Sequence, residues 1–257
     1  MSIDGARVTT VEATMHRFML AELNTHRVFS RNSASSRAIP VARQIERVLD
    51  DPAMPVEFGG KQAGMQAGPP LEGGALEAAR AAWLEARDAA VVSARRLADL
   101  GVHKQVVNRL LEPFMWHTVI VTATDWDGFW HQRCSPLAQP EIRIVADAMR
   151  EAFDASTPSP VEPGDWHLPF ITDVDRAEVP DLDVLRKISA ARCGRVSYLN
   201  HAGRRDLDDD LHLYARFVEA QPAHASPLEH VATPADPGRS SAGNLRGWIQ
   251  LRHLVLT

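Results

Sequence analysis

The longest regular pattern in the sequence covers residues 76–100, where Ala and Arg dominate and apolar residues recur at helical spacing. Gly101 follows at the position where a glycine commonly ends a helix, because glycine adopts the left-handed conformation without strain. We therefore predict one long helix here. The apolar stripe on this helix is expected to pack into the core, and it consists of Leu84, Val91, Val92 and Leu97.

Shorter patterns on both sides of this helix mix strand and helix signals. Residues 6–13 alternate as in a strand, whereas residues 14–24 place Met15, Phe18, Met19 and Leu23 at helical spacing. An apolar run occupies residues 116–121, and residues 244–255 have the composition of a strand. Further helices are predicted at residues 41–49, 103–111, 138–153 and 207–219. Pro140 and Glu141 suit a first helical turn, and Asp206 suits an N-cap. The fold is therefore expected to mix α and β structure.

Two segments have the composition of connections. Residues 50–74 are rich in Gly, Pro and Met and are expected to form a long loop. Loops of this length are uncommon unless they serve a site or an interface, so a contact over a ligand or with another subunit is one expectation. Residues 155–182 are rich in Pro and Asp and are expected to form a surface connection.

Composition excludes several classes of function. The formal net charge of -5 argues against a dedicated nucleic-acid binder, which usually carries a basic surplus. No stretch approaches the ~20 apolar residues that span a bilayer, and the N-terminal residues lack signal-peptide character. The two cysteines, Cys134 and Cys193, have no metal-ligand spacing and are too few for a disulfide framework. We expect a cytoplasmic protein without a metal site and without nucleic-acid or membrane partners.

The most functional-looking segment is THRVFSRNSASSRA, residues 25–38, which holds one histidine, three arginines, one asparagine and four serines. Arg pairs bidentately with phosphate oxygens, while Ser and backbone groups can complete the shell around a phosphate. A solvated Ser/Arg loop is the simpler interpretation of such a run taken alone.

The same segment resembles the signature of the flavin-dependent thymidylate synthases, RHRxxSxNxxSxRY. The positions in register are His26, Arg27, Ser30, Asn32, Ser35 and Arg37. Thr25 replaces the first Arg of the signature, and Ala38 replaces its final Tyr. The resemblance implies an α+β fold with an antiparallel sheet flanked by helices.

Two later segments extend this resemblance. VNRLLEPFMWHT is similar to a family segment with a phosphate-binding Arg, which is Arg109 here, although a lone helical Arg is most often solvated. TATDWDGFWHQRCSPLAQPEIRIVA is similar to a flavin-contacting stretch followed by Phe-x-x-Arg and Ala-Gln-x-Glu-Ile. Arg133 stands where the family has the Arg that faces the pyrimidine carbonyls, and Gly128 stands where many members have a flavin-binding Asn.

The last resemblance lies in AARCGRVSYLNH and AHASPLEHVATP, where Ser226, Pro227, Glu229 and His230 match a Ser-Pro-Phe-Glu-His segment. In the family this segment precedes the arginine-serine signature, whereas here it lies near the C-terminus. We therefore predict a circular permutation within a single domain over residues 1–257, with a helical insertion at about residues 41–100. Permutation is feasible where chain termini lie close together at the surface.

The family reaction transfers a one-carbon unit from methylenetetrahydrofolate to carbon 5 of dUMP, giving dTMP, with FAD as cofactor and NADPH as reductant. The resemblance implies a homotetramer whose sites combine several subunits. It implies Arg133 as the catalytic residue. The implied substrate-binding residues are Glu22, Ser33, Ser35, Ser36, Arg37, Arg109 and Arg133. The implied cofactor-binding residues are His26, Arg27, Ser30, Asn32, Thr122, Thr124 and His230.

Four departures from the family pattern keep alternatives open. Glu22 stands where the family commonly has Gln, and its carboxylate could accept a hydrogen bond from an exocyclic amine, so methylation or hydroxymethylation of dCMP is one alternative. Thr25, Ala38 and Gly128 could instead mark a non-catalytic flavin- or nucleotide-binding paralogue. A thiol route through Cys134, next to Arg133, is a weaker hypothesis because thiolate activation needs a suitable environment.

Overall fold

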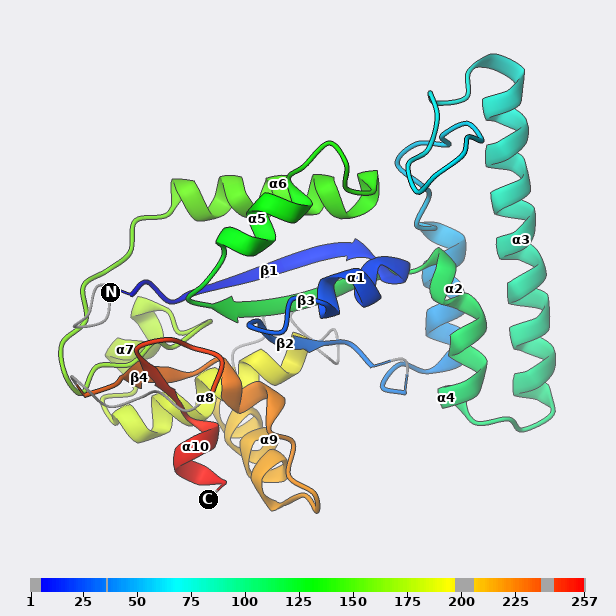
Figure 1. The fold of residues 1–257 in the computed structure, drawn as a ribbon. Helices are drawn as coiled ribbons and strands as arrows, with labels where there is room; N and C mark the ends of the chain where they lie inside the picture. Colours follow the sequence, from blue (N-terminus) through cyan, green and yellow to red (C-terminus); the bar gives the residue numbers. More distant parts are fainter. Residues whose placement is uncertain (1–5, 36, 197–205, 237–242, 257) are drawn as a thin grey trace.

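A three-stranded antiparallel sheet forms the centre of the computed structural model, which describes residues 6–35, 37–196, 206–236 and 243–256. The strand order is β1 (Thr9–His16), β3 (Trp116–Ala123) and β2 (Ser30–Ser33), as Figure 1 shows. In this register Thr122 of β3 lies opposite Thr10 of β1 on one side and Ser30 of β2 on the other. Side chains of directly opposite residues share a face of the sheet, so these three hydroxyl groups form one row across it.

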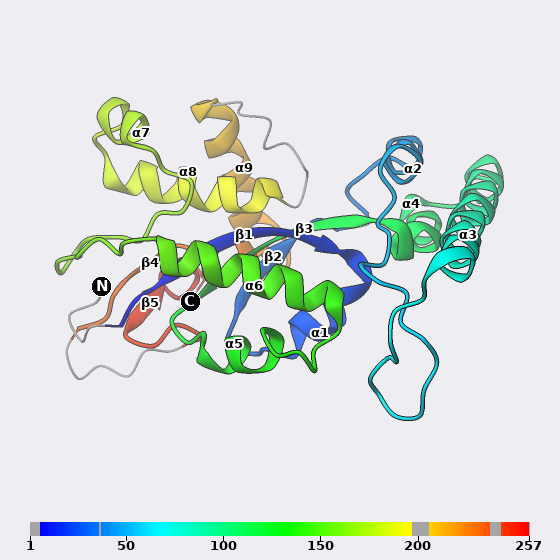
Figure 2. The same cartoon turned by 90° about the horizontal axis from the view of Figure 1, so that it is seen from above.

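The two faces of the sheet are covered by different parts of the chain. Val119, Val121 and Ala123 of β3 belong to the core under α5 (Asp127–Arg133) and α6 (Pro140–Ala155). The alternate residue Ile120 packs instead against Cys193 of α8 (Leu182–Arg195). Figures 1 and 2 show α5 and α6 on one side of the strands and the C-terminal elements on the other. We call these the α5 face and the α8 face.

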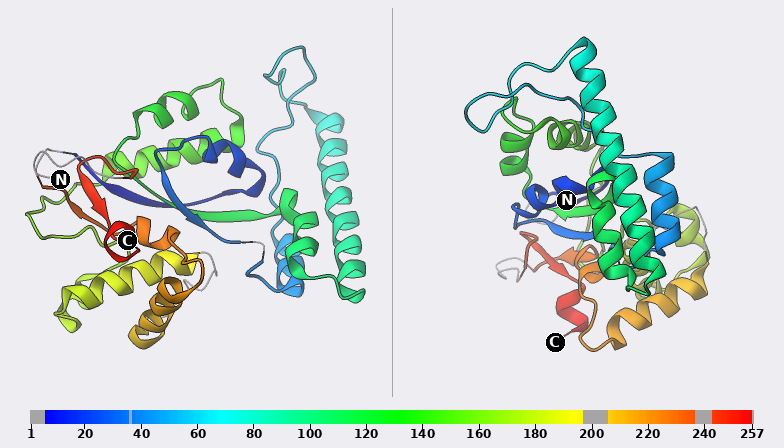
Figure 3. Two further views of the ribbon diagram at one scale, coloured as in Figure 1. Left: turned by 60° about the horizontal axis from the view of Figure 1, so that its bottom comes forward. Right: turned by 90° about the vertical axis from the view of Figure 1, so that its right-hand side faces the viewer.

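A helical arm stands beside the sheet, as the left view in Figure 3 shows. Its own core joins the helices around Val91, Val107 and Leu111. Gly101 has φ +78, which confirms the predicted left-handed end of the long helix. Trp83 donates from its indole Nε1 to the carbonyl of Ala53, which ties the loop after the first arm helix to the long helix. The arm consists of α2 (Val41–Asp50), α3 (Gly73–Asp99), α4 (Lys104–Val107) and η2 (Asn108–Phe114).

The C-terminal half forms a second cluster on the α8 face. Its core includes Leu185, Ile188, Leu228 and Val231. A two-stranded antiparallel sheet, β4–β5, lies beside the end of the main sheet. The elements of this half are α7 (Asp173–Glu178), α8, α9 (Leu207–Glu219), η4 (Ser226–Glu229), β4 (Ala232–Pro234), β5 (Trp248–Gln250) and α10 (Arg252–Val255).

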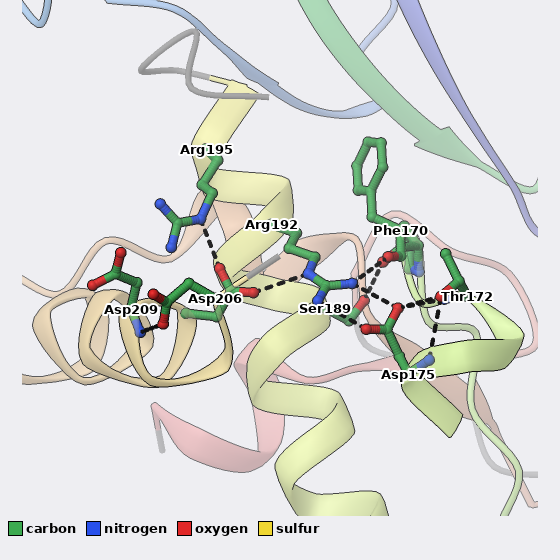
Figure 4. Close-up of polar contacts among 10 residues, drawn as sticks. Phe170, Thr172, Asp175, Ser189, Arg192, Arg195, Asp206 and Asp209 are labelled. Atoms are coloured by element: carbon green, nitrogen blue, oxygen red, sulfur yellow. Dashed lines mark hydrogen bonds and ion pairs between the residues drawn. The ribbon is translucent and has the colours of Figure 1, made fainter. Parts of the chain in front are cut away.

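A buried ion-pair network holds α7, α8 and α9 together (Figure 4). Arg192 bonds both carboxylate oxygens of Asp175 at 2.8 and 3.0 Å and one oxygen of Asp210 at 2.9 Å. The second oxygen of Asp210 accepts from Arg195 at 2.6 Å. Arg192 also donates to the carbonyl of Phe170, a residue with φ +62. A buried charge is stable only when it is fully paired, so this network fixes how the three helices meet.

The predicted α+β class is confirmed, and so is the Asp206 N-cap, whose side chain accepts from the backbone N–H of Asp209. Several local predictions were wrong. The helix predicted at residues 14–24 begins with the last residues of β1, followed by η1 (Arg17–Met19) and α1 (Leu20–Asn24). The loop predicted at the signature contains β2. This strand forms because it pairs with the edge of β3, and its polar sequence alone does not indicate that pairing. The connection predicted at residues 155–182 contains α7, and the helix predicted at residues 103–111 splits into α4 and η2. The C-terminal strand is short, and α10 follows it.

Two absences concern only the part of the chain that the structure describes. There, no helix is both long and apolar enough to cross a membrane. Nor do three or more His, Cys, Asp or Glu side chains gather as a metal site would require within these same ranges.

Candidate functional site

Arg133, the predicted catalytic residue, is the last residue of α5 and bonds the start of the signature. Its Nε donates to Nε2 of His26 at 2.9 Å. Its Nη2 donates to the backbone carbonyl of Glu22 at 3.2 Å and to Oγ1 of Thr25 at 3.1 Å. The described part of the chain gives Nη1 no hydrogen-bond partner. The guanidinium is therefore fixed along one edge, and its other corner can bind a ligand.

His26 is a neutral acceptor in this arrangement. Burial, and then the positive charges of Arg133 and Arg31, lower the pKa of His26 to about 4. Its ring lies 4.9 Å from the ring of Phe129 in an edge contact and 5.6 Å from Phe29 in a stacked contact. Because Nε2 accepts from Arg133, the neutral ring carries its proton on Nδ1. At neutral pH the site therefore has one fixed cation and an uncharged imidazole.

Arg31 is a site residue that the motif analysis missed. Its Nη1 donates to the backbone carbonyl of His26 at 2.7 Å and lies within 3.3 Å of the carbonyl of Leu23. These bonds close the last turn of α1 (Leu20–Asn24) and hold the chain that carries Glu22 and His26. Arg31 lies inside the signature, but the family pattern leaves its position unspecified, so the motif gave no signal for it.

Glu22 lies in the same turn as the Arg133 contacts. Its Oε2 is buried and has no hydrogen-bond partner among the described residues. A buried carboxylate oxygen without a donor is costly, so a ligand that supplies an N–H group here would remove a penalty. The geometry thus groups Glu22, Thr25, His26 and Arg133, and we call these four residues the arginine pocket.

A second group of predicted residues lies beyond the other end of β2. Lys104 donates to the carbonyl of Ala38 at 3.3 Å, and Asn108 donates to the carbonyl of Ile39 at 3.0 Å. These bonds bring the helix with Arg109 beside the turn that carries Arg37, which is exposed. The backbone N–H of Arg37 donates to Oγ of Ser35. We call Ser35, Arg37, Lys104 and Arg109 the cationic turn.

Arg109 is already paired within the chain. Glu112 accepts from Arg109 at 2.9 Å and from Arg17 at 3.1 Å. Lys104 is a cation that the motif analysis missed, since a single Lys at a helix start carries no specific signal. Ser33 is the last residue of β2, between the two groups. Ser36 lies outside the described residues, so its predicted role in substrate binding has no structural description.

The arginine pocket and the cationic turn do not meet within one chain. The first precedes β2 and the second follows it, and the four residues of β2 rise roughly 3.3 Å each, or about 10 Å in all. A nucleotide that bound both groups of a single protomer would have to span this distance.

Most of the predicted cofactor residues form a third group, on the α8 face. The hydroxyls of Ser30 and Thr122 and the ring of His230 are all fully buried. Thr122 bonds Nδ1 of His230 at 2.7 Å, and Ser30 accepts from Gln250 at 2.7 Å. Asn32 donates to the carbonyl of Cys193 at 2.8 Å and accepts from Ser226 at 3.2 Å. These side chains are therefore engaged by the chain itself, although Nε2 of His230 is buried without a hydrogen-bond partner among the described residues.

The remaining predicted cofactor residues differ in access. Thr124 accepts from the backbone N–H of Arg246 at 2.9 Å, while Arg27 is exposed and His26 lies in the arginine pocket. Burial lowers the pKa of His230 to about 3, so this ring is also neutral. Within one protomer the seven residues predicted to contact FAD do not surround one site: Ser30, Thr122 and His230 are enclosed on the α8 face, whereas His26 lies beside α5.

Cys134 does not support a thiol mechanism. Burial, followed by hydrogen bonding and charge repulsion from Asp147, raises the pKa of its thiol. The reactive form of a cysteine is the thiolate, so a raised pKa disfavours nucleophilic attack at neutral pH. Arg133, next to it in the chain, does not reverse this effect.

Comparison with known proteins gives the family. The model of the thymidylate synthase complementing proteins matches residues 6–159, which is more than half of the chain. The chain belongs to this family, whose members are of the thymidylate synthase type. The match includes residues 41–100, the predicted insertion, and stops before the Ser226–Glu229 segment, so the permutation stays a prediction.

Among solved structures, the chain is similar to a UMP/dUMP methylase, PolB from Streptomyces cacaoi, crystallised with 5-Br dUMP. The two share 18% sequence identity at a TM-score of 0.41. The similarity covers 57% of this chain and 65% of that chain, less than two thirds of its length. No curated protein matches the chain.

Proposed function

We propose that this protein is a flavin-dependent methyltransferase that transfers a one-carbon unit from methylenetetrahydrofolate to carbon 5 of dUMP, giving dTMP. FAD and NADPH are the redox partners that the family implies. The observation that carries the proposal is the arginine pocket, in which His26, Glu22 and Thr25 fix Arg133 along one edge. Family membership supports the same reaction class.

The proposed reaction requires a fixed cation beside the pyrimidine ring. Carbon 5 becomes nucleophilic only when negative charge can spread over the ring carbonyls and the ring nitrogen. A guanidinium keeps its proton at any working pH, so Arg133 stabilises that charge and does not act as a base. Because its orientation is set before the ligand arrives, no reorganisation is needed when the charge develops.

The phosphate is assigned to the cationic turn. Arg37, Lys104 and Arg109 supply positive charge, and Ser35 supplies a hydroxyl next to the backbone of this turn. Arg–phosphate pairs add geometric specificity to charge attraction. Since the arginine pocket lies at the other end of β2, we propose that the pocket of one protomer faces the cationic turn of another in a homotetramer.

The direct test is tritium release from carbon 5 of labelled dUMP. Purified protein would be incubated with FAD, NADPH and methylenetetrahydrofolate under anaerobic conditions. We expect release by the wild type and a loss of about 10²-fold or more in Arg133→Ala. Arg95→Ala, an exposed arginine on α3, is the matched control and should keep wild-type release. Equal release by Arg133→Ala and the wild type would refute the role of Arg133.

Glu22 supports a second candidate substrate, dCMP. A carboxylate only accepts hydrogen bonds, and its Oε2 has no donor among the described residues. The exocyclic amine of cytosine would supply one, whereas the same edge of uracil presents a carbonyl oxygen. Parallel assays with labelled dCMP decide between them: release from dCMP alone, reduced by Glu22→Gln, would replace dUMP as the substrate. No release from either nucleotide, with nucleotide still bound, would indicate the non-catalytic paralogue.

A further inference from the structure

The row of hydroxyls on the α8 face bonds the C-terminal half of the chain to the central sheet. Thr10, Thr122 and Ser30 lie opposite one another on β1, β3 and β2. Each is bonded by one side chain from the C-terminal half, at 2.7 Å in every case, and these side chains are His167, His230 and Gln250. Thr10 and Thr122 also bond each other at 2.6 Å.

A fourth contact continues the row toward the end of β2. Asn32 uses its amide N–H for the carbonyl of Cys193 on α8 and its amide oxygen for the hydroxyl of Ser226 in η4. It therefore joins two C-terminal elements to the central sheet at one point. Together with the hydroxyl row, this places a side chain from residues 160–250 on every strand of the sheet.

Burial excludes a direct ligand contact at Ser30 and Thr122 in this arrangement. Ser30, Thr122 and His230 each have 0% of their surface exposed, and Gln250 has 1%. Gln250 also donates to the carbonyl of Glu229 at 2.8 Å, so its amide bridges two parts of the chain. A flavin could reach Ser30 only if Gln250 left, and it could reach Thr122 only if His230 left. Both moves would leave buried polar groups unpaired, at a cost of about 1–3 kcal/mol each.

We infer that Ser30, Asn32 and Thr122 anchor the C-terminal half onto the sheet, and that the fully buried Ser30 and Thr122 do not contact the flavin. The signature thus serves two purposes: the residues before β2 orient Arg133, and the residues within β2 hold the two halves together. The statement about FAD rests on the proposed function, whereas the statement about the anchor rests only on the contacts above.

A double-mutant cycle on Ser30 and Gln250 tests the anchor in the full-length chain. Ser30→Ala and Gln250→Leu should each lower the Tm by about 2–8 °C, because each leaves a buried polar partner unsatisfied. The double variant should lose clearly less than the sum of the two single losses, since one shared bond is removed. Ser93→Ala, an exposed serine on α3, is the control and should leave the Tm unchanged. Additive losses in the double variant would overturn the anchor.

FAD binding by the reconstituted protein tests the second part. Quenching of flavin fluorescence should give a Kd for Ser30→Ala within about twofold of the wild type. A Kd raised tenfold or more at unchanged Tm would overturn the inference. Thr122→Val and Thr122→Ser form a second pair: Val should lower the Tm more than Ser, because Ser loses a buried methyl group but keeps the hydroxyl. If the wild type itself binds no FAD, the flavin part of the proposed function fails, while the cycle still decides the anchor.

Discussion

The Nε of Arg133 donates to Nε2 of His26 at 2.9 Å, so the predicted catalytic cation is oriented by a residue predicted to bind the cofactor. The bond crosses from the end of α5 to the start of the signature and joins two motifs that lie far apart in the sequence. His26 accepts this bond only while it is neutral, and its lowered pKa keeps it neutral at working pH.

This bond predicts a graded response to substitution at His26. His26→Ala removes the acceptor and should lower kcat for tritium release about 10²-fold, because a small displacement of a positioned group carries a large cost. His26→Gln places an oxygen near the former Nε2 and should recover part of that loss. The KM for dUMP should change little, since the phosphate is bound elsewhere. His212→Ala, an exposed histidine on α9, serves as the control, and equal losses in the Ala and Gln variants would contradict the positioning role.

The buried histidines predict that stability falls as the solution becomes mildly acidic. Burial, as the first cause in each case, lowers the pKa of His167 to about 4 and that of His117 and His230 to about 3. The unfolded chain takes up protons on these rings below about pH 6.5, whereas the folded chain does not. The stabilising contribution is therefore complete above about pH 6.5 and is lost progressively as the pH falls toward these lowered values.

Urea unfolding at pH 7 and at pH 5.5 measures this effect. We expect a lower free energy of unfolding at pH 5.5 for the wild type. His117→Gln should show a smaller difference between the two pH values, because one titrating ring is gone, whatever its effect on absolute stability. His131→Gln, at an exposed position on α5, should leave the difference unchanged. A wild-type protein that is equally stable at both pH values would refute the prediction.

Motif resemblance indicated three residues of the arginine pocket but none of the contacts of the anchor. The resemblance assigns Glu22 and Arg133 to the substrate and His26 to the cofactor, and three hydrogen bonds from Arg133 to residues 22–26 bring these residues together. The partners of Ser30 and Thr122 follow from sheet register and from packing of the distant C-terminal half, which no motif encodes. The cofactor role predicted for Ser30 and Thr122 therefore stays a prediction, while their contacts with the C-terminal half are what the fold shows.

The missed helix α8 (Leu182–Arg195) shows a second limit. All of its residues from Ile188 to Gly194 are buried, so the sequence lacks the apolar and polar alternation that reveals a surface helix. In the sequence Arg192 and Ser189 indicate solvent-exposed positions, yet both side chains are buried and hydrogen-bonded within the protein. A helix enclosed on every side can be recognised only once its neighbours are known.

The network around Arg192 predicts a large loss of stability from one conservative change. Asp175 is fully buried and binds Arg192 with both carboxylate oxygens. Asp175→Asn leaves the buried guanidinium with half its counter-charge, and we expect the free energy of unfolding to fall by about 3–5 kcal/mol. Asp183→Asn, which removes a half-exposed partner of Lys187, should cost about 1 kcal/mol or less. Similar losses in both variants, measured by urea unfolding, would contradict the distinction.

The separation of the two substrate groups by β2 predicts complementation between inactive chains. Arg133→Ala disables the arginine pocket, and Arg37→Ala disables the cationic turn, so each variant alone should lose tritium release. If each site joins the pocket of one chain to the turn of another, co-expression of differently tagged variants should restore about a quarter of wild-type activity, as random pairing across an isologous interface gives. Arg133→Ala co-expressed with His26→Ala is the matched control, because both changes affect the pocket and no intact site can form. Mixed Arg133→Ala and Arg37→Ala chains that co-purify yet remain inactive would show that a single chain contributes both groups.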